Sequence, residues 1–205
     1  MQLFLASSLQ TTGSRIAKAL LDRKINGRVM FMTTASEPEK GDLSWLHADR
    51  QSLVDAGLDV FDYSVTNKTE LEIEKVFKGV GAVCVAGGNT YYLLHHVRKS
   101  GFDKVVTRLV SKGLPYIGSS AGALLAGPTI QTSLDDPEIV PELTDYTGLN
   151  LCDTSIRPHW GSEHFANRYK DEFDRLYSLQ NPMILLTDNQ YVFVEDNKYT
   201  IISVG

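Results

Sequence analysis

The stretch LPYIGSSAGALLAG, residues 114–127, joins a short apolar run to a segment rich in alanine and leucine. The apolar run ends at Ile117, and GSSAG, residues 118–122, follows at once. This pentapeptide fits the pattern G-x-S-x-G, in which a nucleophilic serine stands on a sharp turn between a strand and a helix. Glycine suits the flanking positions because a side chain there would clash within the turn. The stretch therefore predicts a strand, a tight elbow and a helix, with Ser120 as the candidate nucleophile.

Strand-like and helix-like segments alternate on the N-terminal side of this stretch. The strand-like runs are residues 2–8, 27–36, 58–65 and 80–88. Between them, apolar residues recur at helical spacing, as Ile16, Ala19 and Leu20 do. Strands that are apolar on both faces and alternate with amphipathic helices predict a mainly parallel sheet covered on both sides. The predicted fold class is therefore α/β, with three layers in the order α/β/α.

The C-terminal part of the chain has a different pattern. Residues 183–205 alternate apolar and polar side chains, and Asp196-Asn197 divides them, which predicts an antiparallel hairpin at the sheet edge. No repeat or linker interrupts the sequence. A chain of 205 residues can bury one full core, so we expect residues 1–205 to form a single catalytic domain.

Composition narrows the class of function. The net charge is −5 and the basic residues are scattered, which argues against a nucleic-acid partner. The sequence contains no run of about 20 apolar residues, and its first residues lack a basic segment before the apolar stretch, so we expect neither a membrane partner nor a signal peptide. The two cysteines, Cys84 and Cys152, do not form a disulfide framework. These features predict a cytoplasmic protein.

In doubly wound sheets, functional side chains gather where the parallel strands end. The residues predicted to lie at such ends are Ser7-Ser8, Thr33-Thr34, residues 87–90, Ser119-Ser120 and Thr187-Asp188. A catalytic serine also needs a base. His159 stands in TSIRPHWG, where Pro158 ends a strand-like run, and this setting favours a base on a strand-end loop. His164 is the second candidate, whereas the other three histidines, His47, His95 and His96, fall within predicted helices.

An acid is expected to orient the histidine. Asp188 follows the apolar run in MILLTDNQ, and Asp135 and Asp136 are the alternatives. If Asp188 is the orienting acid, the chain order is serine, histidine, acid, which differs from the order in α/β-hydrolases. If Asp135 is the orienting acid, chain order does not discriminate between folds. The residues alone leave this choice open.

Several motifs together resemble the peptidase E family of aspartyl dipeptidases, serine peptidases with the class I glutamine amidotransferase-like fold. The motifs are GGNT at 87–90, GSSAGA at 118–123, PTIQT at 128–132, then Asp135, then PHW at 158–160 and a late acid. The similarity covers most of the chain and is strongest from residue 83 to 137. The better-known members carry a large aromatic residue where this chain has Ser119.

The resemblance assigns candidate roles residue by residue. It places the nucleophile at Ser120, the histidine at His159 and the late acid at Asp188. It implies oxyanion donors at the backbone N–H groups of Gly88 and Ala121. For substrate binding, it implies that Arg168 holds an acidic side chain and that Asp135 binds the amino group of the substrate or supports the histidine.

The expected function is hydrolysis of small peptides, most simply dipeptides, with an N-terminal aspartate as a candidate preference. The alternatives are a cyanophycinase-like hydrolase of the same fold, which would act on aspartyl-arginine linkages, and a non-enzymatic domain that binds a small ligand. No cofactor is expected, and no metal, because the histidines lack a ligand spacing such as H-E-x-x-H. The resemblance also suggests a homodimer, which no sequence feature decides.

Overall fold

The computed structural model of the chain describes residues 1–25, 27–163, 165–166 and 181–205. Its strands are β1 (Gln2–Ala6), β2 (Arg28–Met32), β3 (Val60–Tyr63), β4 (Val80–Val85), β5 (Tyr116–Ser119), β6 (Ser155–Arg157), β7 (Met183–Leu185), β8 (Gln190–Glu195) and β9 (Lys198–Ser203). Its α-helices are α1 (Leu9–Asp22), α2 (Ser44–Asp55), α3 (Glu70–Val76), α4 (Thr90–Ser100), α5 (Phe102–Ser111) and α6 (Ala121–Ala126). Two short 3-10 helices are η1 (Thr34–Ser36) and η2 (Pro137–Ile139).

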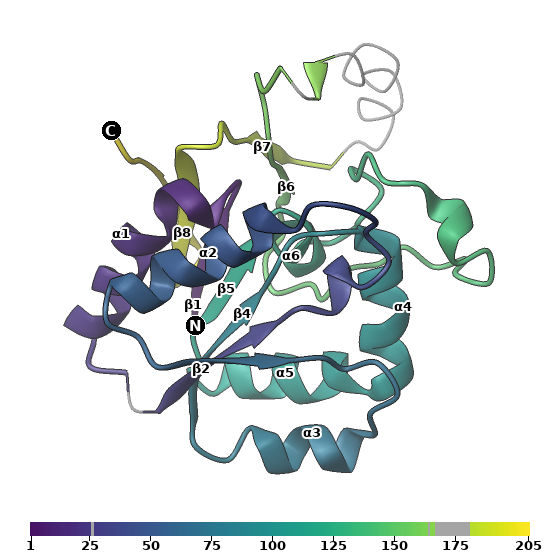
Figure 1. Cartoon of the computed structure of the whole chain (residues 1–205), viewed down its shortest axis with the longest axis horizontal. Coiled ribbons are helices and arrows are strands. Elements are labelled where there is room, and N and C mark those ends of the chain that lie inside the picture. Colours follow the sequence, from purple (N-terminus) through teal and green to yellow (C-terminus); the bar gives the residue numbers. More distant parts are fainter. Residues whose placement is uncertain (26, 164, 167–180) are drawn as a thin grey trace.

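A seven-stranded sheet forms the centre of the molecule, with the strand order β3-β2-β4-β5-β1-β8-β9. Strands β1 to β5 run parallel to their neighbours in this sheet. Strand β8 pairs antiparallel with β1, and β9 pairs antiparallel with β8. The predicted α/β fold, mainly parallel with an antiparallel C-terminal hairpin, is confirmed (Figure 1).

The two faces of the sheet are covered by different helices. Phe4 and Ala6 of β1 belong to a buried cluster that includes α1 and α2. Leu3 and Leu5 point to the other face, where a second buried cluster includes α3, α4, α5 and α6. Because side chains alternate along a strand, a run that is apolar at every position can be buried on both faces. The three predicted layers are therefore α1 and α2, the sheet, and α3 to α6.

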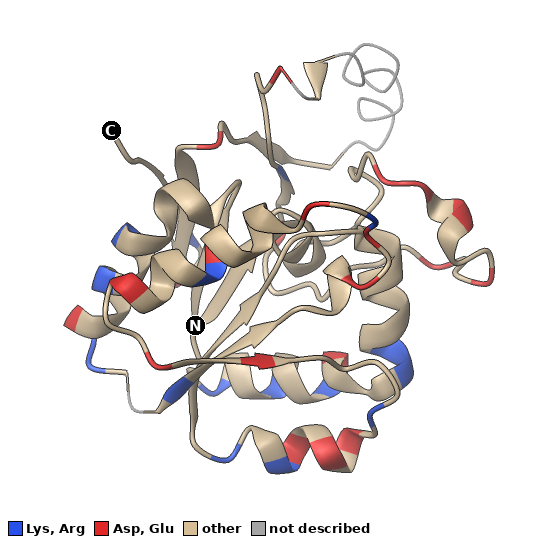
Figure 2. Cartoon of the chain, in the orientation of Figure 1, with Lys and Arg blue, Asp and Glu red and all other residues tan. Residues whose placement is uncertain are grey.

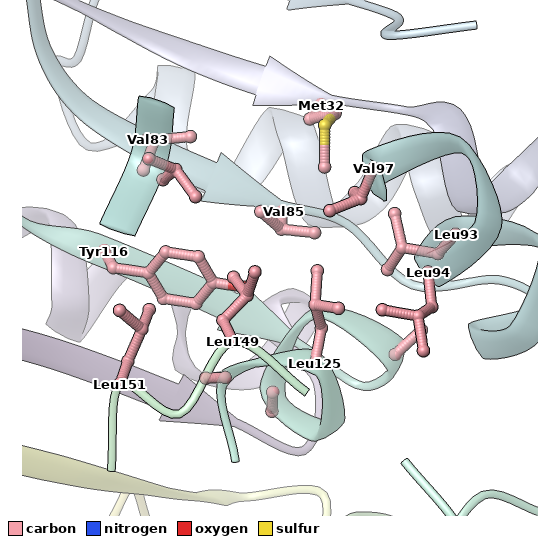
Figure 3. Packing of buried hydrophobic residues seen from close by; sticks show 14 of the residues in the cluster. Met32, Val83, Val85, Leu93, Leu94, Val97, Tyr116, Leu125, Leu149 and Leu151 are labelled. Carbon is pink, nitrogen blue, oxygen red and sulfur yellow. The ribbon is translucent and has the colours of Figure 1, made fainter. Parts of the chain in front are cut away.

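The core under α4 and α6 holds the end of β5 in place. In Figure 3, Val85 of β4 lies among side chains from α4 and α6, including Val97 and Leu125. Tyr116 of β5 is buried in the same cluster, and its hydroxyl donates a 2.7 Å hydrogen bond to the carbonyl oxygen of Gly122. A buried hydroxyl needs such a partner. This bond fixes α6 against the strand from which it emerges.

Capping residues fix where two of the helices begin. At α3, Thr69 and Glu72 form a reciprocal capping box, in which each side chain accepts from the other residue's backbone N–H. At α4, the Asn89 side chain accepts a 2.9 Å hydrogen bond from the N–H of Tyr92. The helix α4 therefore starts directly after the GGN turn that follows β4, and this turn lies next to the end of β5.

A second, two-stranded sheet was not predicted. Residues 183–185, which the alternating pattern assigned to the C-terminal hairpin, form β7 and pair in parallel with β6. The hairpin itself contains only β8 and β9, because a turn interrupts the chain where the Gln190 N–H donates to the carbonyl oxygen of Thr187. The prediction for residues 183–185 was therefore wrong in its pairing.

Charges of both signs are distributed over the surface. Figure 2 shows Lys and Arg on several different helices, and Asp and Glu along the segment that carries η2. None of the helices in the described part of the chain combines the length and apolar character that crossing a lipid bilayer requires. Both cysteines are buried, and burial raises the pKa of the Cys84 thiol well above its ordinary value. Cys84 is therefore a buried apolar residue rather than a reactive thiol.

Candidate active site

The elbow between β5 and α6 has the geometry that its sequence predicts. Ser120 has φ 49° and ψ −108°, in the positive-φ region that residues other than glycine rarely occupy. A Cβ atom added at Gly118 would lie 2.5 Å from the backbone of Gly122. A Cβ atom added at Gly122 would lie 2.0 Å from the carbonyl oxygen of Val85. Both glycines are therefore required for α6 to start so close to β4 and β5.

We expect Gly122→Ala to lower the free energy of unfolding by about 3 kcal/mol, because the new methyl group meets backbone atoms that cannot rotate away. Gly113→Ala is the matched control. At Gly113 an added Cβ meets nothing within 4 Å, so the control carries only the strain of its φ of +104°, about 1–2 kcal/mol. Urea denaturation of both variants measures the difference. Equal losses would contradict the close approach of α6 and β4.

Pairing between β6 and β7 brings a histidine and a carboxylate together. The two strands run parallel, and the pairing continues past their ends as the Leu186 N–H donates to the Arg157 carbonyl oxygen and the Trp160 N–H donates to the Leu186 carbonyl oxygen. His159 and Asp188 follow these two strands, so they lie at the same end of the small sheet. Residues 29 positions apart in sequence thus become neighbours.

Three side chains form a continuous line of hydrogen bonds. His159 Nε2 lies 2.9 Å from Ser120 Oγ, and His159 Nδ1 lies 2.6 Å from Asp188 Oδ1. The hydrogen bond with His159 is the main cause that lowers the pKa of Asp188, and it outweighs partial burial, which acts in the opposite direction. Asp188 therefore stays ionised at neutral pH. This arrangement can remove a proton from the serine hydroxyl and stabilise the imidazolium that forms.

Ser7 supports both members of the histidine and carboxylate pair. Its Oγ donates a 2.8 Å hydrogen bond to Asp188 Oδ1 and accepts a 2.7 Å hydrogen bond from the backbone N–H of His159. Ser7 was predicted from the sequence to lie at a strand end, but no catalytic or supporting role was predicted for it. Its contacts depend on β1 lying beside β8, a long-range pairing that no local pattern reveals.

Of the two predicted oxyanion donors, Gly88 lies in the turn between β4 and α4, and Ala121 lies in the elbow itself. Gly88 has φ +127°, and a Cβ atom added there would lie 2.2 Å from the carbonyl oxygen of Ala35. Ala121 is the first residue of α6, where backbone N–H groups have no partner within the helix. Gly87, Gly88, Ser119 and Ser120 all line the same cavity. A developing oxyanion beside Ser120 is the kind of group that such N–H groups bind.

The remaining predicted site residues are Asp135, which the structure places at the cavity, and Arg168 and His164, which it does not describe. Asp135 lines the cavity but contacts the start of α4 rather than His159. Its Oδ2 accepts a 2.7 Å hydrogen bond from the Thr90 N–H and a 2.8 Å hydrogen bond from Ser133 Oγ. The carboxylate beside the imidazole in the structure is that of Asp188, 2.6 Å from His159 Nδ1. Arg168 and His164 lie outside the described residues.

The cavity around Ser120 has a volume of about 940 Å³. Phe165 stacks on the His159 ring, with the ring centroids 4.8 Å apart, and Trp45 forms part of the wall. Within the described ranges, the acidic side chains that line it are Glu39, Asp49, Asp135, Asp136 and Asp188, and the one arginine is Arg157. In those ranges, no group of three or more His, Cys, Asp and Glu side chains could hold a metal ion.

Sequence reasoning missed Trp45 and Asp49. Both lie on α2, which was predicted from the sequence as a helix that covers the sheet and was given no functional residue. One signal was present for Asp49, because it falls on the apolar side of the helix between Leu46 and Leu53 and is buried with them. A carboxylate in such a stripe needs polar partners in the interior. Its partners come from other parts of the chain and could not be identified from α2 alone.

Comparison with known proteins identifies the kind of enzyme to which this chain is similar. A family model described as Peptidase family S51 matches residues 3–202. The chain is 28% identical over 199 residues to the uncharacterized peptidase Lin0382 of Listeria innocua, and the match covers 96% of this chain and 93% of that relative. It is 43% identical over 93 residues to Peptidase E of Nostoc sp., and this match covers 45% of this chain and 38% of that relative.

Solved structures with the same fold include two peptidases. A crystal structure of a candidate peptidase E protein from Listeria monocytogenes superposes with a TM-score of 0.86 at 25% sequence identity, covering 100% of this chain and 98% of that chain. A peptidase from an acI-B1 Actinobacterium has a TM-score of 0.75 at 16% identity, covering 98% of this chain and 87% of that chain. The second likeness bears on the fold alone.

Proposed function

The chain belongs to peptidase family S51 and is a serine peptidase, and we propose that its nucleophile is Ser120, its general base His159 and its orienting acid Asp188. The observation that carries these roles is the unbroken line of hydrogen bonds from Ser120 Oγ through the imidazole to the Asp188 carboxylate. Because the chain is an enzyme, the alternative of a non-enzymatic ligand-binding domain is set aside.

The proposed reaction is acyl transfer to the serine and then to water. Ser120 Oγ attacks the scissile carbonyl carbon while His159 Nε2 takes the hydroxyl proton. The N–H groups of Gly88 and Ala121 hold the oxyanion of the tetrahedral intermediate. His159 then gives its proton to the leaving amine, and an acyl-enzyme remains. Water attacks this ester with His159 again as the base, which releases the acid and restores Ser120.

We further propose that the substrates are small peptides, in particular dipeptides. Asp135 is the proposed binding partner of the substrate's amino group. Its Oδ2 holds Thr90 and Ser133, whereas its Oδ1 accepts no hydrogen bond from the described residues. An ammonium group could therefore bind Oδ1 without breaking these contacts. The family resemblance supplies Arg168 as the partner of an N-terminal aspartate side chain.

Substrate preference can be measured with a panel of X-Leu dipeptides. If Arg168 binds an acidic side chain through a bidentate ion pair, Arg168→Ala should lower kcat/KM for Asp-Leu at least tenfold and leave Ala-Leu nearly unchanged. Arg108→Ala, on the exposed side of α5 and paired with Glu74, is the matched control and should alter neither rate. Equal wild-type rates for Asp-Leu and Ala-Leu would reject the aspartyl preference and leave the serine mechanism in place.

Because the cavity lining is acidic, an aspartyl-arginine dipeptide should be added to the same substrate panel. Carboxylates outnumber cationic side chains around the cavity in the described part of the chain, which suits a substrate with a basic group. A cyanophycinase-like activity would cleave an aspartyl-arginine dipeptide faster than Asp-Leu. Slower cleavage of the arginine substrate would reject this alternative.

A further inference from the structure

Asp49 is a buried carboxylate at the edge of the candidate active site. It projects from α2, its side chain lines the cavity, and the residue is only 5% exposed. Neither the peptidase mechanism nor the family resemblance assigns it a role. A charged group is expensive to bury without partners, so the contacts of this carboxylate indicate what it does.

Both carboxylate oxygens of Asp49 hold parts of the chain that lead to the catalytic candidates. Oδ1 accepts a 2.7 Å hydrogen bond from the backbone N–H of Gln10, in the first turn of α1. Oδ2 accepts a 2.8 Å hydrogen bond from Ser119 Oγ, at the end of β5. Ser119 directly precedes Ser120, and the turn before α1 carries Ser7. Asp49 thus joins the elbow of the nucleophile to the turn that supports the histidine and its acid.

We propose that Asp49 is a positioning residue for catalysis, and that its ionised carboxylate holds Ser119, and through it the Ser120 elbow, in register with the Ser7 turn. This inference rests on the proposed function, because the elbow matters for turnover only if Ser120 is the nucleophile. Asp49 does not need to touch the substrate. It acts through Ser119, which precedes Ser120, and through the first turn of α1, which follows the turn that carries Ser7.

The ionised form is the one that fits these contacts. The Gln10 N–H can only donate, so Oδ1 must accept, and in the ionised form Oδ2 accepts from Ser119 Oγ. A protonated Oδ2 would instead donate to Ser119 Oγ, which would reverse this hydrogen bond and turn the serine hydroxyl away. Burial raises the pKa of Asp49 to about 6, and the Ser119 hydroxyl, the backbone N–H groups of Gln10 and Leu9 and the charge of His159 oppose this rise.

One neighbour of Asp49, the Cys84 thiol, does not compete for its proton. Cys84 of β4 is the second titratable neighbour, and its thiol stays neutral because burial and the Asp49 charge both raise its pKa. The ionisable groups that face Asp49 are therefore His159 and Cys84 in the described part of the chain. As the pH falls through about 6, Asp49 takes up a proton, and the arrangement around Ser119 changes.

The test compares Asp49→Asn with wild type. Asparagine can still accept from Gln10, but it carries no charge and turns its NH₂ group toward Ser119. We expect kcat to fall at least tenfold, KM to change less than twofold, and the acid side of the kcat profile to become shallower, because Asp49 no longer adds to the effect of protonating the general base. The melting temperature at pH 8 should not fall, because the variant removes a charge that burial disfavours. Asp55→Asn, an exposed carboxylate on the same helix, is the control and should match wild type.

A purely structural role would lower the melting temperature and leave the pH profile unchanged, and that result overturns the inference. A wild-type kcat and pH profile in Asp49→Asn also overturns it. Labelling by a fluorophosphonate probe distinguishes failure of the Asp49 inference from failure of the proposed function. A wild-type protein that neither hydrolyses peptides nor labels at Ser120 rejects the serine mechanism itself.

Amide hydrogen exchange tests the positioning without any turnover. The Ser120 N–H donates to the Ala6 carbonyl oxygen, and the Val83 N–H donates to the Pro115 carbonyl oxygen deep in the sheet. In Asp49→Asn we expect exchange at Ser120 to become at least tenfold faster and exchange at Val83 to stay unchanged. Unchanged exchange at both amides shows that Asp49 does not hold the elbow.

Discussion

Ser120→Ala is expected to lower kcat for dipeptide hydrolysis by about 10⁴-fold or more, with the fold and the melting temperature preserved. The variant removes the only atom that forms the acyl-enzyme, while the oxyanion donors and the substrate-binding contacts remain. The helix α6 is not expected to move, because alanine keeps the Cβ atom that already occupies this elbow.

Two measurements check this prediction. Steady-state rates on the best X-Leu substrate give the loss in kcat, and a fluorophosphonate probe followed by peptide mapping gives the labelled residue. Ser111→Ala, which removes an exposed hydroxyl at the end of α5, is the control and should keep full activity and labelling. A Ser120→Ala variant that hydrolyses the peptide at the wild-type rate rejects Ser120 as the nucleophile.

The fold and the elbow could be predicted from sequence because their signals are local. The elbow needs five adjacent residues, and strands buried on both faces are apolar at consecutive positions whatever lies beside them. Strand-end reasoning also selected His159 and Asp188, which lie 2.6 Å apart in the structure. These two residues are adjacent to short runs that end in proline or a polar turn, a pattern visible without knowledge of the pairing.

The supporting residues could not be predicted because their contacts join distant segments. Strands β6 and β7 contain three residues each, too few for a recognisable period, and each is stabilised by the other. Ser7 reaches Asp188 across 181 positions, and Asp49 reaches Ser119 across 70. A serine at a strand end and an aspartate on a helix are common features, and only the tertiary structure shows what they hold.

Asp188→Asn is the second prediction with a large expected effect, a loss in kcat of about 10⁴-fold. The Asp188 carboxylate accepts from both His159 Nδ1 and Ser7 Oγ through Oδ1. Asparagine has one acceptor oxygen and an NH₂ group, so it can orient its NH₂ group toward Nδ1. The imidazole would then carry its proton on Nε2 and could not accept the proton of Ser120. The protein should stay folded, because the backbone of Asp188 keeps its contact with Thr11.

Asp135→Asn is the matched control for this prediction, since both carboxylates line the same cavity. Asp135 contacts Thr90 and Ser133, so its variant should raise KM more than it lowers kcat. The lowered pKa of Asp188 means that this group stays charged as the pH falls from 8 to 5, so its titration does not limit the wild-type rate in that range. Rates measured from pH 5 to 8 on both variants decide between the two acids. If Asp135→Asn loses kcat by 10⁴-fold and Asp188→Asn does not, Asp135 orients the histidine during turnover and the proposed role of Asp188 is wrong.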